Sequence, residues 1–267
     1  MTAPSTVPAP GRHDVPSTRV LARTCAAEWT RLWTVAATWW FLAAATVAMV
    51  GIGAIAGFEA ASGAEPAQGD PAWAVATVAA MPAQFAFLAL ALTAVTSDYA
   101  TGGIVPALQW TPRRGTLFLA RAAVPVAVAT VLAVLLGAAS GLAAWAAARP
   151  GLTLPWADGL GALATVALVV AAGAALAVGL GFLLRHTAGA LVTVFLLMLV
   201  LPLFLPQFGY DWLSSLAQVL PGSGAAFLLL GQVPGMTETS SVAVLLAWAA
   251  GALVLGWVRL TRADANR

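Results

Sequence analysis

The charged residues of this chain are separated by long apolar stretches, and this spacing restricts the possible fold more than any other feature. Between consecutive charges, six strongly apolar runs occupy residues 32–58, 71–97, 122–148, 159–184, 186–210 and 239–258. Each run has about 20 residues or more, enough for an α-helix to cross a hydrocarbon layer about 30 Å thick. A soluble domain needs polar loops and outer helix faces, yet 8% of these residues are charged, against about 25% in an ordinary soluble domain. We therefore expect an all-α membrane protein with six transmembrane helices.

Arginine is spread unequally over the segments between these runs. The chain has no lysine, and eleven of its 12 basic residues lie before the first run, after the sixth, or in the second-to-third and fourth-to-fifth connections. The other three connections contain one arginine, Arg149. Basic residues accumulate in the cytoplasmic loops of membrane proteins. The sequence therefore predicts that both termini are cytoplasmic, which requires an even number of crossings.

Residues 212–237 are also uncharged and could be taken for a seventh span. They include Pro221, Pro234 and four glycines, which make a continuous membrane helix unfavourable. A seventh crossing would also place the arginines after the sixth run on the outside. We interpret this stretch as an external or re-entrant segment before the last span, with residues 225–230 dipping into the interface.

The N-terminal part divides into two segments ahead of a transmembrane domain at 35–267. Residues 1–17 are rich in Pro, Ala, Ser and Thr, so we expect a disordered cytoplasmic tail. Residues 18–34 have helical periodicity, which predicts an amphipathic helix at the membrane interface. On this helix Arg19 and Arg23 lie opposite an apolar face made by Leu21, Cys25, Trp29 and Leu32. The helix could be a simple membrane anchor, or its polar edge, Glu28 and Arg31, could contact a partner or form a pair within the helix.

The connection between the second and third runs is the densest polar stretch of the chain. It contains Ser97-Asp98-Tyr99-Ala100-Thr101-Gly102-Gly103 and then Gln109-Trp110-Thr111-Pro112-Arg113-Arg114-Gly115. The glycines permit a turn and Pro112 breaks a helix, so we expect one short helix at 104–110 between them. Such a helix could fit a groove on a partner. From composition alone, Arg113 and Arg114 could equally serve to fix the topology and bind anionic lipid.

These two polar stretches carry a resemblance to a known family. Ala27-Glu28-Trp29-Thr30-Arg31-Leu32, followed by Thr38-Trp39-Trp40, resembles the N-terminal motif of ABC-2 type transporter permeases. Ser97–Ile104 is similar to that family's acidic-Tyr-Arg-Thr-Gly-Thr-Ile element, with Asp98, Ala100 and Gly103 as departures. Pro112-Arg113-Arg114-Gly115, with Arg121 further on, is similar to its Pro-Arg-Arg element and following basic position.

The resemblance implies a membrane-spanning permease subunit of an ATP-binding cassette transporter, an exporter in a prokaryotic plasma (inner) membrane. Two permease subunits, identical or different, would form the pathway, and a separate ATPase subunit would bind ATP and Mg²⁺. No cofactor is then expected in this chain. The residues expected to couple it to the ATPase are Glu28, Arg31, Asp98, Tyr99, Thr101, Gly102, Pro112, Arg113 and Arg114.

Other kinds of activity have less support in the sequence. Without lysine the chain cannot contain a phosphate-binding G-x-x-x-x-G-K-[ST] loop, and no ionisable residue lies inside a predicted span, as proton- or ion-coupled carriers require. An intramembrane protease would need Ser140 or Ser223, but His13 and His186 lie in a predicted tail and at a span edge. No cluster predicts a metal site. We expect no catalytic residue, and a non-transporting membrane scaffold or sensor partner is the alternative function.

Overall fold

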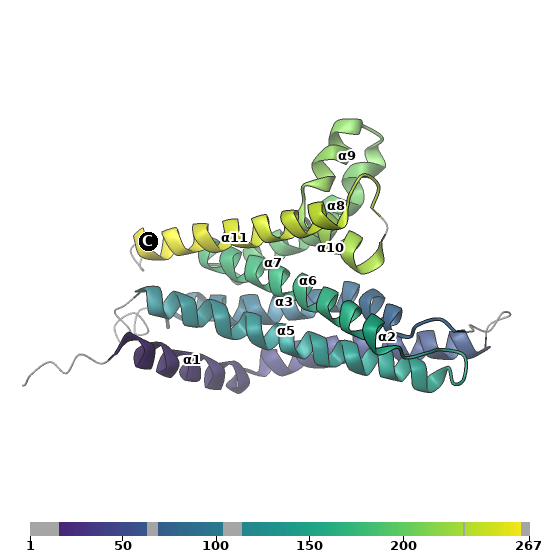
Figure 1. Ribbon diagram of the computed structural model, residues 1–267. Coiled ribbons are helices and arrows are strands. Elements are labelled where there is room, and N and C mark those ends of the chain that lie inside the picture. Colours follow the sequence, from purple (N-terminus) through teal and green to yellow (C-terminus); the bar gives the residue numbers. More distant parts are fainter. Residues whose placement is uncertain (1–15, 63–68, 104–113, 232, 263–267) are drawn as a thin grey trace, which may run out of the picture.

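The computed structural model describes residues 16–62, 69–103, 114–231 and 233–262. In these residues the secondary structure is helical, apart from one isolated β-bridge between Pro71 and Thr153. The elements, labelled as in Figure 1, are α1 (Ser17–Thr34), α2 (Ala36–Ser62), α3 (Trp73–Thr101), α5 (Arg114–Ala147), α6 (Trp156–Leu184), α7 (Thr187–Phe195), the π-helix η1 (Leu196–Val200), α8 (Leu201–Phe204), the 3-10 helix η2 (Leu205–Phe208), α9 (Asp211–Gln218), α10 (Pro221–Leu230) and α11 (Glu238–Arg262).

Six helical segments of the described chain are long and apolar enough to cross a membrane. They are α2, α3, α5, α6, the continuous stretch Thr187–Phe208 and α11. Each corresponds to one of the six apolar runs, so the expected all-α fold with six helices long and apolar enough to cross a membrane is confirmed, and the chain has the make-up of a multi-pass membrane protein. The helices run side by side in a bundle, with the start of α1 and the last turn of α11 at the same end (Figure 1).

Two helices extend further toward this end than the apolar runs predicted. Helix α3 continues to Thr101 and is closed by Gly102, whose φ of 74° is the left-handed conformation that glycine adopts readily. Asp98 and Tyr99 therefore lie in the last turn of a helix, whereas the sequence placed them in the connection. Helix α5 begins at Arg114, which puts Arg121 about two turns inside it.

Helix α6 is central to the bundle and packs against α3, α5 and α11. Small residues set the closest helix approaches. A Cβ atom on Gly53 or Gly57 of α2 would overlap the backbone of Ser140 or Ala144 on α5. A Cβ atom on Gly179 of α6 would likewise overlap the backbone of α11. Glycine thus allows these backbones to come within a distance that any side chain would prevent.

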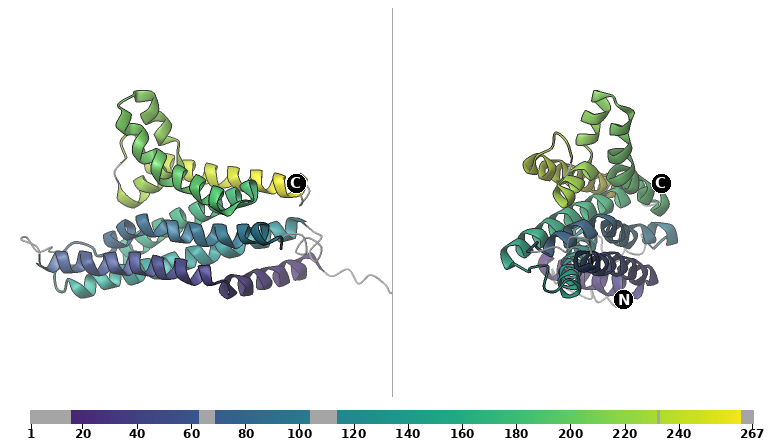
Figure 2. Two further views of the ribbon diagram at one scale, coloured as in Figure 1. Left: turned by 180° about the vertical axis from the view of Figure 1, so that it is seen from behind. Right: turned by 90° about the vertical axis from the view of Figure 1, so that its right-hand side faces the viewer.

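The segment before the last span is a bent pair of helices. Helices α9 and α10 meet at 77° around Val219 and Leu220, so the expectation that residues 212–237 do not form one straight helix is confirmed. Helix α10 packs against α11, and its first turns, Pro221 to Ala225, are buried. Helix α9 projects from the bundle, as both views in Figure 2 show. Residues 225–230, expected to dip into the interface, form the second half of α10.

Helix α1 packs alongside α5 at the end of the bundle where α3 ends (Figure 1). It stops at Thr34 because Val35 has an extended backbone. Residues from the start of α2 then bond the free carbonyl groups of its last turn: Thr38 Oγ1 donates to Leu32 O at 2.7 Å, and Trp39 Nε1 donates to Trp33 O at 3.1 Å. These bonds give Thr38 and Trp39 of the Thr38-Trp39-Trp40 motif a structural role, which is to fix the angle between α1 and α2.

Candidate functional site at the arginine-rich end of the bundle

Helix α1 presents a charged residue to the bundle where an apolar one was expected. Glu28 and Leu32 are its buried residues, while Trp29 is 53% exposed. The inward stripe is thus formed by Leu21, Cys25, Glu28 and Leu32, with Glu28 in the place that was predicted for Trp29. A carboxylate can occupy a buried helix face when it is paired with cations. Glu28 meets this condition through two arginines.

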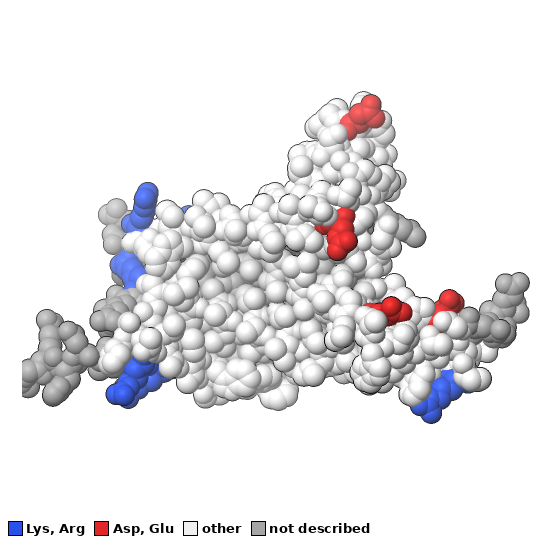
Figure 3. Space-filling view, in the orientation of Figure 1, with Lys and Arg blue, Asp and Glu red and all other residues white. Residues whose placement is uncertain are grey.

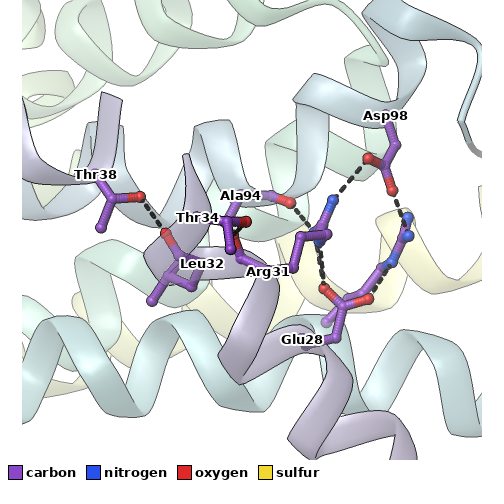
Figure 4. Close-up of polar contacts among 8 residues, drawn as sticks. Glu28, Arg31, Leu32, Thr34, Thr38, Ala94 and Asp98 are labelled. Atoms are coloured by element: carbon purple, nitrogen blue, oxygen red, sulfur yellow. Dashed lines mark hydrogen bonds and ion pairs between the residues drawn. The ribbon is translucent and has the colours of Figure 1, made fainter. Parts of the chain in front are cut away.

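Glu28, Arg31, Asp98 and Arg121 form a closed ring in which opposite charges alternate; we call this set the ion-pair ring (Figure 4). Glu28 Oε2 accepts from Arg31 Nε at 3.0 Å and lies 2.7 Å from Arg31 Nη2, and Glu28 Oε1 accepts from Arg121 Nε at 2.9 Å. Arg31 Nη1 donates to Asp98 Oδ1 at 2.7 Å, and Arg121 Nη2 donates to Asp98 Oδ2. Each of the four carboxylate oxygens therefore accepts a charge-assisted bond.

The ring joins three helices. Glu28 and Arg31 come from α1, Asp98 from the last turn of α3, and Arg121 from α5. The Arg31 guanidinium also donates to the carbonyl oxygen of Ala94, one turn before Asp98 on α3. A cavity of about 20 Å³, the size that holds one water molecule, lies beside the ring and is lined partly by the polar side chains of Thr38, Thr93 and Ser97. The ring thus ties α1 to the ends of α3 and α5, two of the helices that are long and apolar enough to cross a membrane.

Burial is uneven around the ring. The side chain of Arg121 is 3% exposed and that of Glu28 10%, against 17% for Asp98 and 27% for Arg31. The formal charges of two arginines and two carboxylates cancel, so the ring as a whole adds no net charge to the protein interior. Removing one member would leave an uncompensated buried charge, which is much more costly than the intact pair.

Arg121 is the ring member that was not among the expected site residues. Its sequence position, directly before an apolar run, is that of an ordinary cytoplasmic anchor. Two signals could have identified it. It follows the second polar stretch at the family's basic position, and Leu117, Phe118 and Arg121 are buried at helical spacing. These three residues share one helix face only if the helix begins before Leu117, as α5 does at Arg114. The apolar run alone did not predict this early start.

Arg114, an expected coupling residue, holds the end of α11. Its Nη1 donates to Leu260 O at 3.1 Å and to Thr261 O at 3.0 Å. Arg185 follows α6 and donates from Nη2 to Arg259 O at 3.2 Å. The last carbonyl groups of a helix lack partners within it and carry partial negative charge. Arg114 at the start of α5 and Arg185 just after α6 therefore cap α11 and fix its last turn against α5 and α6.

The remaining expected residues are described in part. Tyr99 is half-buried, and the Arg185 guanidinium lies 5.5 Å from the centre of its ring, a cation–π arrangement. Gly102 is exposed at the end of α3. The side chain of Thr101, all of Pro112 and Arg113, and the short helix expected at 104–110 lie outside the described residues. The structure thus brings Glu28, Arg31 and Asp98 together and places Arg114 apart from them, at the start of α5 with its side chain on the last turn of α11.

The described charges separate toward opposite ends of the bundle (Figure 3). Arg19, Arg23, Arg114, Arg185, Arg259 and Arg262 belong to the end that carries the ion-pair ring, where the only described carboxylates are the ring members Glu28 and Asp98. The other end carries Glu59, Asp70, Asp158, Asp211 and Glu238, with Arg149 stacked on Trp145 at 3.5 Å. This arrangement reproduces in space the unequal arginine distribution of the sequence.

The residues considered for proteolysis or metal binding have local structural contacts. Ser223 Oγ donates to Ala217 O at 2.6 Å, and His186 Nδ1 accepts from Gly189 N at 3.1 Å as the cap of α7. Ser140 is buried where α2 crosses α5. In the part of the chain that the structure describes, no group of three His, Cys, Asp or Glu side chains could hold a metal ion.

Comparison with known proteins adds no family assignment. No protein-family model matches the chain, and no curated protein matches it.

Proposed function

We propose that this chain is the membrane-spanning permease subunit of an ATP-binding cassette transporter of the ABC-2 type. It works as an exporter in the plasma membrane of a prokaryote, with both termini in the cytoplasm. A second permease subunit, identical or different, completes the pathway, and a separate ATPase subunit binds ATP and Mg²⁺. The arginine-rich end of the bundle is the cytoplasmic end in this proposal, as the distribution of basic residues favours.

The observation that supports this proposal most is the convergence of the resembling motifs on one site. Glu28 and Arg31 belong to the first motif, Asp98 to the second, and Arg121 to the basic position after the third. Asp98 lies 67 residues after Arg31, yet their side chains meet in the ion-pair ring. A set of motifs that merely marked membrane edges would not need to come together in one buried cluster.

In this proposal the ATPase binds the exposed parts of the same end. These are the outer face of α1, where Arg19 and Arg23 are exposed, and the connection from Gly102 to Arg114 that contains Pro112 and Arg113. When two ATPase subunits close around ATP, they press on these segments. Rigid-body tilting of the packed helices then carries the movement through the membrane. A membrane scaffold that only holds a lipid or a partner would need no mechanical link between its cytoplasmic segments and its packed helices.

The test is co-purification with an ATPase encoded beside this chain, followed by ATP hydrolysis by the reconstituted complex. We expect Arg113→Glu to reduce co-purification while membrane insertion persists, because it reverses a charge on the proposed docking connection. Arg149→Glu, at the opposite end, is the matched control and should leave co-purification unchanged. Arg113 is the better choice than Arg114, whose side chain caps α11.

Two results would contradict the proposal. One is unchanged ATPase binding by Arg113→Glu. The other is binding with no effect of the permease on ATP turnover, which would favour the scaffold or sensor alternative.

A further inference from the structure

The ion-pair ring has a property that a set of partner-binding residues would lack, because its charges are satisfied within the chain. All four carboxylate oxygens of Glu28 and Asp98 accept bonds from Arg31 and Arg121. Both carboxylates are largely buried. An ATPase residue that bound Glu28 or Asp98 would have to share these carboxylates with Arg31 and Arg121 or displace one of the two arginines.

Of the four ring members, Arg121 depends most on its partners in the ring. It is the most buried of the four, and it bonds Glu28 with Nε and Asp98 with Nη2, two different nitrogens of one planar group. Its third nitrogen, Nη1, is buried without a hydrogen-bond partner among the described residues. Among the described residues, the burial of this cation is therefore compensated by the carboxylates of Glu28 from α1 and Asp98 from α3 alone. If α1 moved away from the bundle, Arg121 would lose one of its two carboxylates.

We propose that Arg121 is a positioning residue, which locks α1 onto the ends of α3 and α5 and makes the ion-pair ring the joint between them. A force on the exposed face of α1 is then transmitted to two membrane-crossing helices. Buried ion pairs add little net stability compared with apolar packing, but they fix geometry in several systems. The joint itself does not depend on the proposed function, whereas its use in transport rests on it.

The joint can be tested on the purified chain alone, because Cys25 is the only cysteine of the sequence. It lies on the inward stripe of α1, one turn before Glu28, and is partly buried. Detachment of α1 should expose it, so the rate of its reaction with a water-soluble maleimide reports how well α1 is docked. We expect Glu28→Gln and Arg121→Met each to raise this rate by between about twofold and a hundredfold, the range of coupling within one salt-bridge network.

The charge balance of the ring gives the decisive comparison. Glu28→Gln with Arg121→Met leaves the neutral pair of Arg31 and Asp98, so the rate should rise less than the product of the two single effects. Glu28→Gln with Asp98→Asn replaces the same number of ring members but leaves the buried Arg121 and the partly exposed Arg31 without a carboxylate partner in the ring. This second pair should give a faster reaction and, where folding fails, a lower yield of folded protein than the first. Arg19→Met, on the exposed face of α1, should leave the rate unchanged.

Arg121→Lys separates positioning from mere charge. One ammonium nitrogen cannot reproduce bonds that Arg121 makes with two separate nitrogens, so we expect a rate between those of Arg121→Met and the unaltered chain. In the complex, Arg121→Lys should keep normal co-purification with the ATPase but reduce the permease-dependent change in ATP turnover. This is the opposite of the binding loss expected for Arg113→Glu.

Two outcomes would overturn the joint. One is an unchanged Cys25 reaction rate in folded Glu28→Gln and Arg121→Met. The other is equal behaviour of the neutral and the doubly cationic variants, which would mean that Glu28 acts outside the ring. If Cys25 responds as expected but no ATPase binds, the joint stands and the proposed function fails.

Discussion

At the scale of single residues, four arginines at the ion-pair-ring end of the bundle bond other residues of the same chain. Arg31 and Arg121 neutralise two buried carboxylates, and Arg114 and Arg185 cap the last turn of α11. The positive-inside tendency explains why arginines are on this side but not which partner each one has. Arg suits such places better than Lys, because its planar guanidinium holds five N–H donors on three separate nitrogens, whereas the three donors of an ammonium share one nitrogen.

The cap on α11 leads to a prediction at this scale. Arg114→Gln removes a charged donor from Leu260 O and Thr261 O, which should cost about 1 kcal/mol locally. Amide hydrogen exchange in the last turn of α11 should therefore become roughly fivefold faster. Arg262→Gln, an exposed residue of the same turn, is the control and should change exchange much less. Equal exchange in both variants would contradict the assigned cap.

The sequence predicted less at the residue scale than at any other. It identified Glu28, Arg31 and Asp98 as important but assigned Glu28 to a polar edge, because a lone carboxylate is normally excluded from a buried face. Its burial depends on Arg121, which is 93 residues away. Local periodicity contains no information about such a contact.

At the scale of elements, close backbone packing between α2 and α5 depends on glycine. Gly53 lies two residues after Gly51, and Gly57 follows one turn later. Both Gly53 and Gly57 are on the face of α2 that contacts α5. Gly51 has no atom within 4 Å of the position that a Cβ would take. The contrast between neighbouring glycines of one helix provides a matched experiment.

Gly53→Leu should destabilise the protein by about 1–3 kcal/mol or more, because the side chain would overlap the Ser140 backbone and force the helices apart. Gly51→Leu should have little effect, since the added side chain meets open space. Thermal unfolding of the purified protein in detergent measures both. Similar losses of stability in the two variants would show that α2 and α5 do not pack as described.

The sequence predicted that the long apolar helices exist, but it did not predict the residues at which α3 ends and α5 begins. Apolar length predicted the six described helices that are long and apolar enough to cross a membrane, because a hydrocarbon layer requires this length of uncharged chain. The polar ends of α3 and α5 were assigned to a connection, since an uncharged run stops at the first charge. A helix does not stop there when its charges find partners, as Asp98 and Arg121 do.

At the scale of the whole molecule, the two ends of the bundle differ in charge. The ion-pair ring, the α11 cap and the exposed arginines of α1 are all at one end, and the described acidic residues outside the ring are at the other (Figure 3). The proposed ATPase can act on this site only if that end is in the cytoplasm. Membrane orientation is therefore the central claim.

Site-directed cysteine labelling tests this claim most directly. In a Cys25→Ser background, Asp211→Cys on exposed α9 and Arg259→Cys on the exposed face of α11 are treated in intact cells with a membrane-impermeant maleimide. We predict labelling of Asp211→Cys from outside, and labelling of Arg259→Cys only after the cells are opened. Labelling of Arg259→Cys in intact cells, with Asp211→Cys protected, would contradict the account.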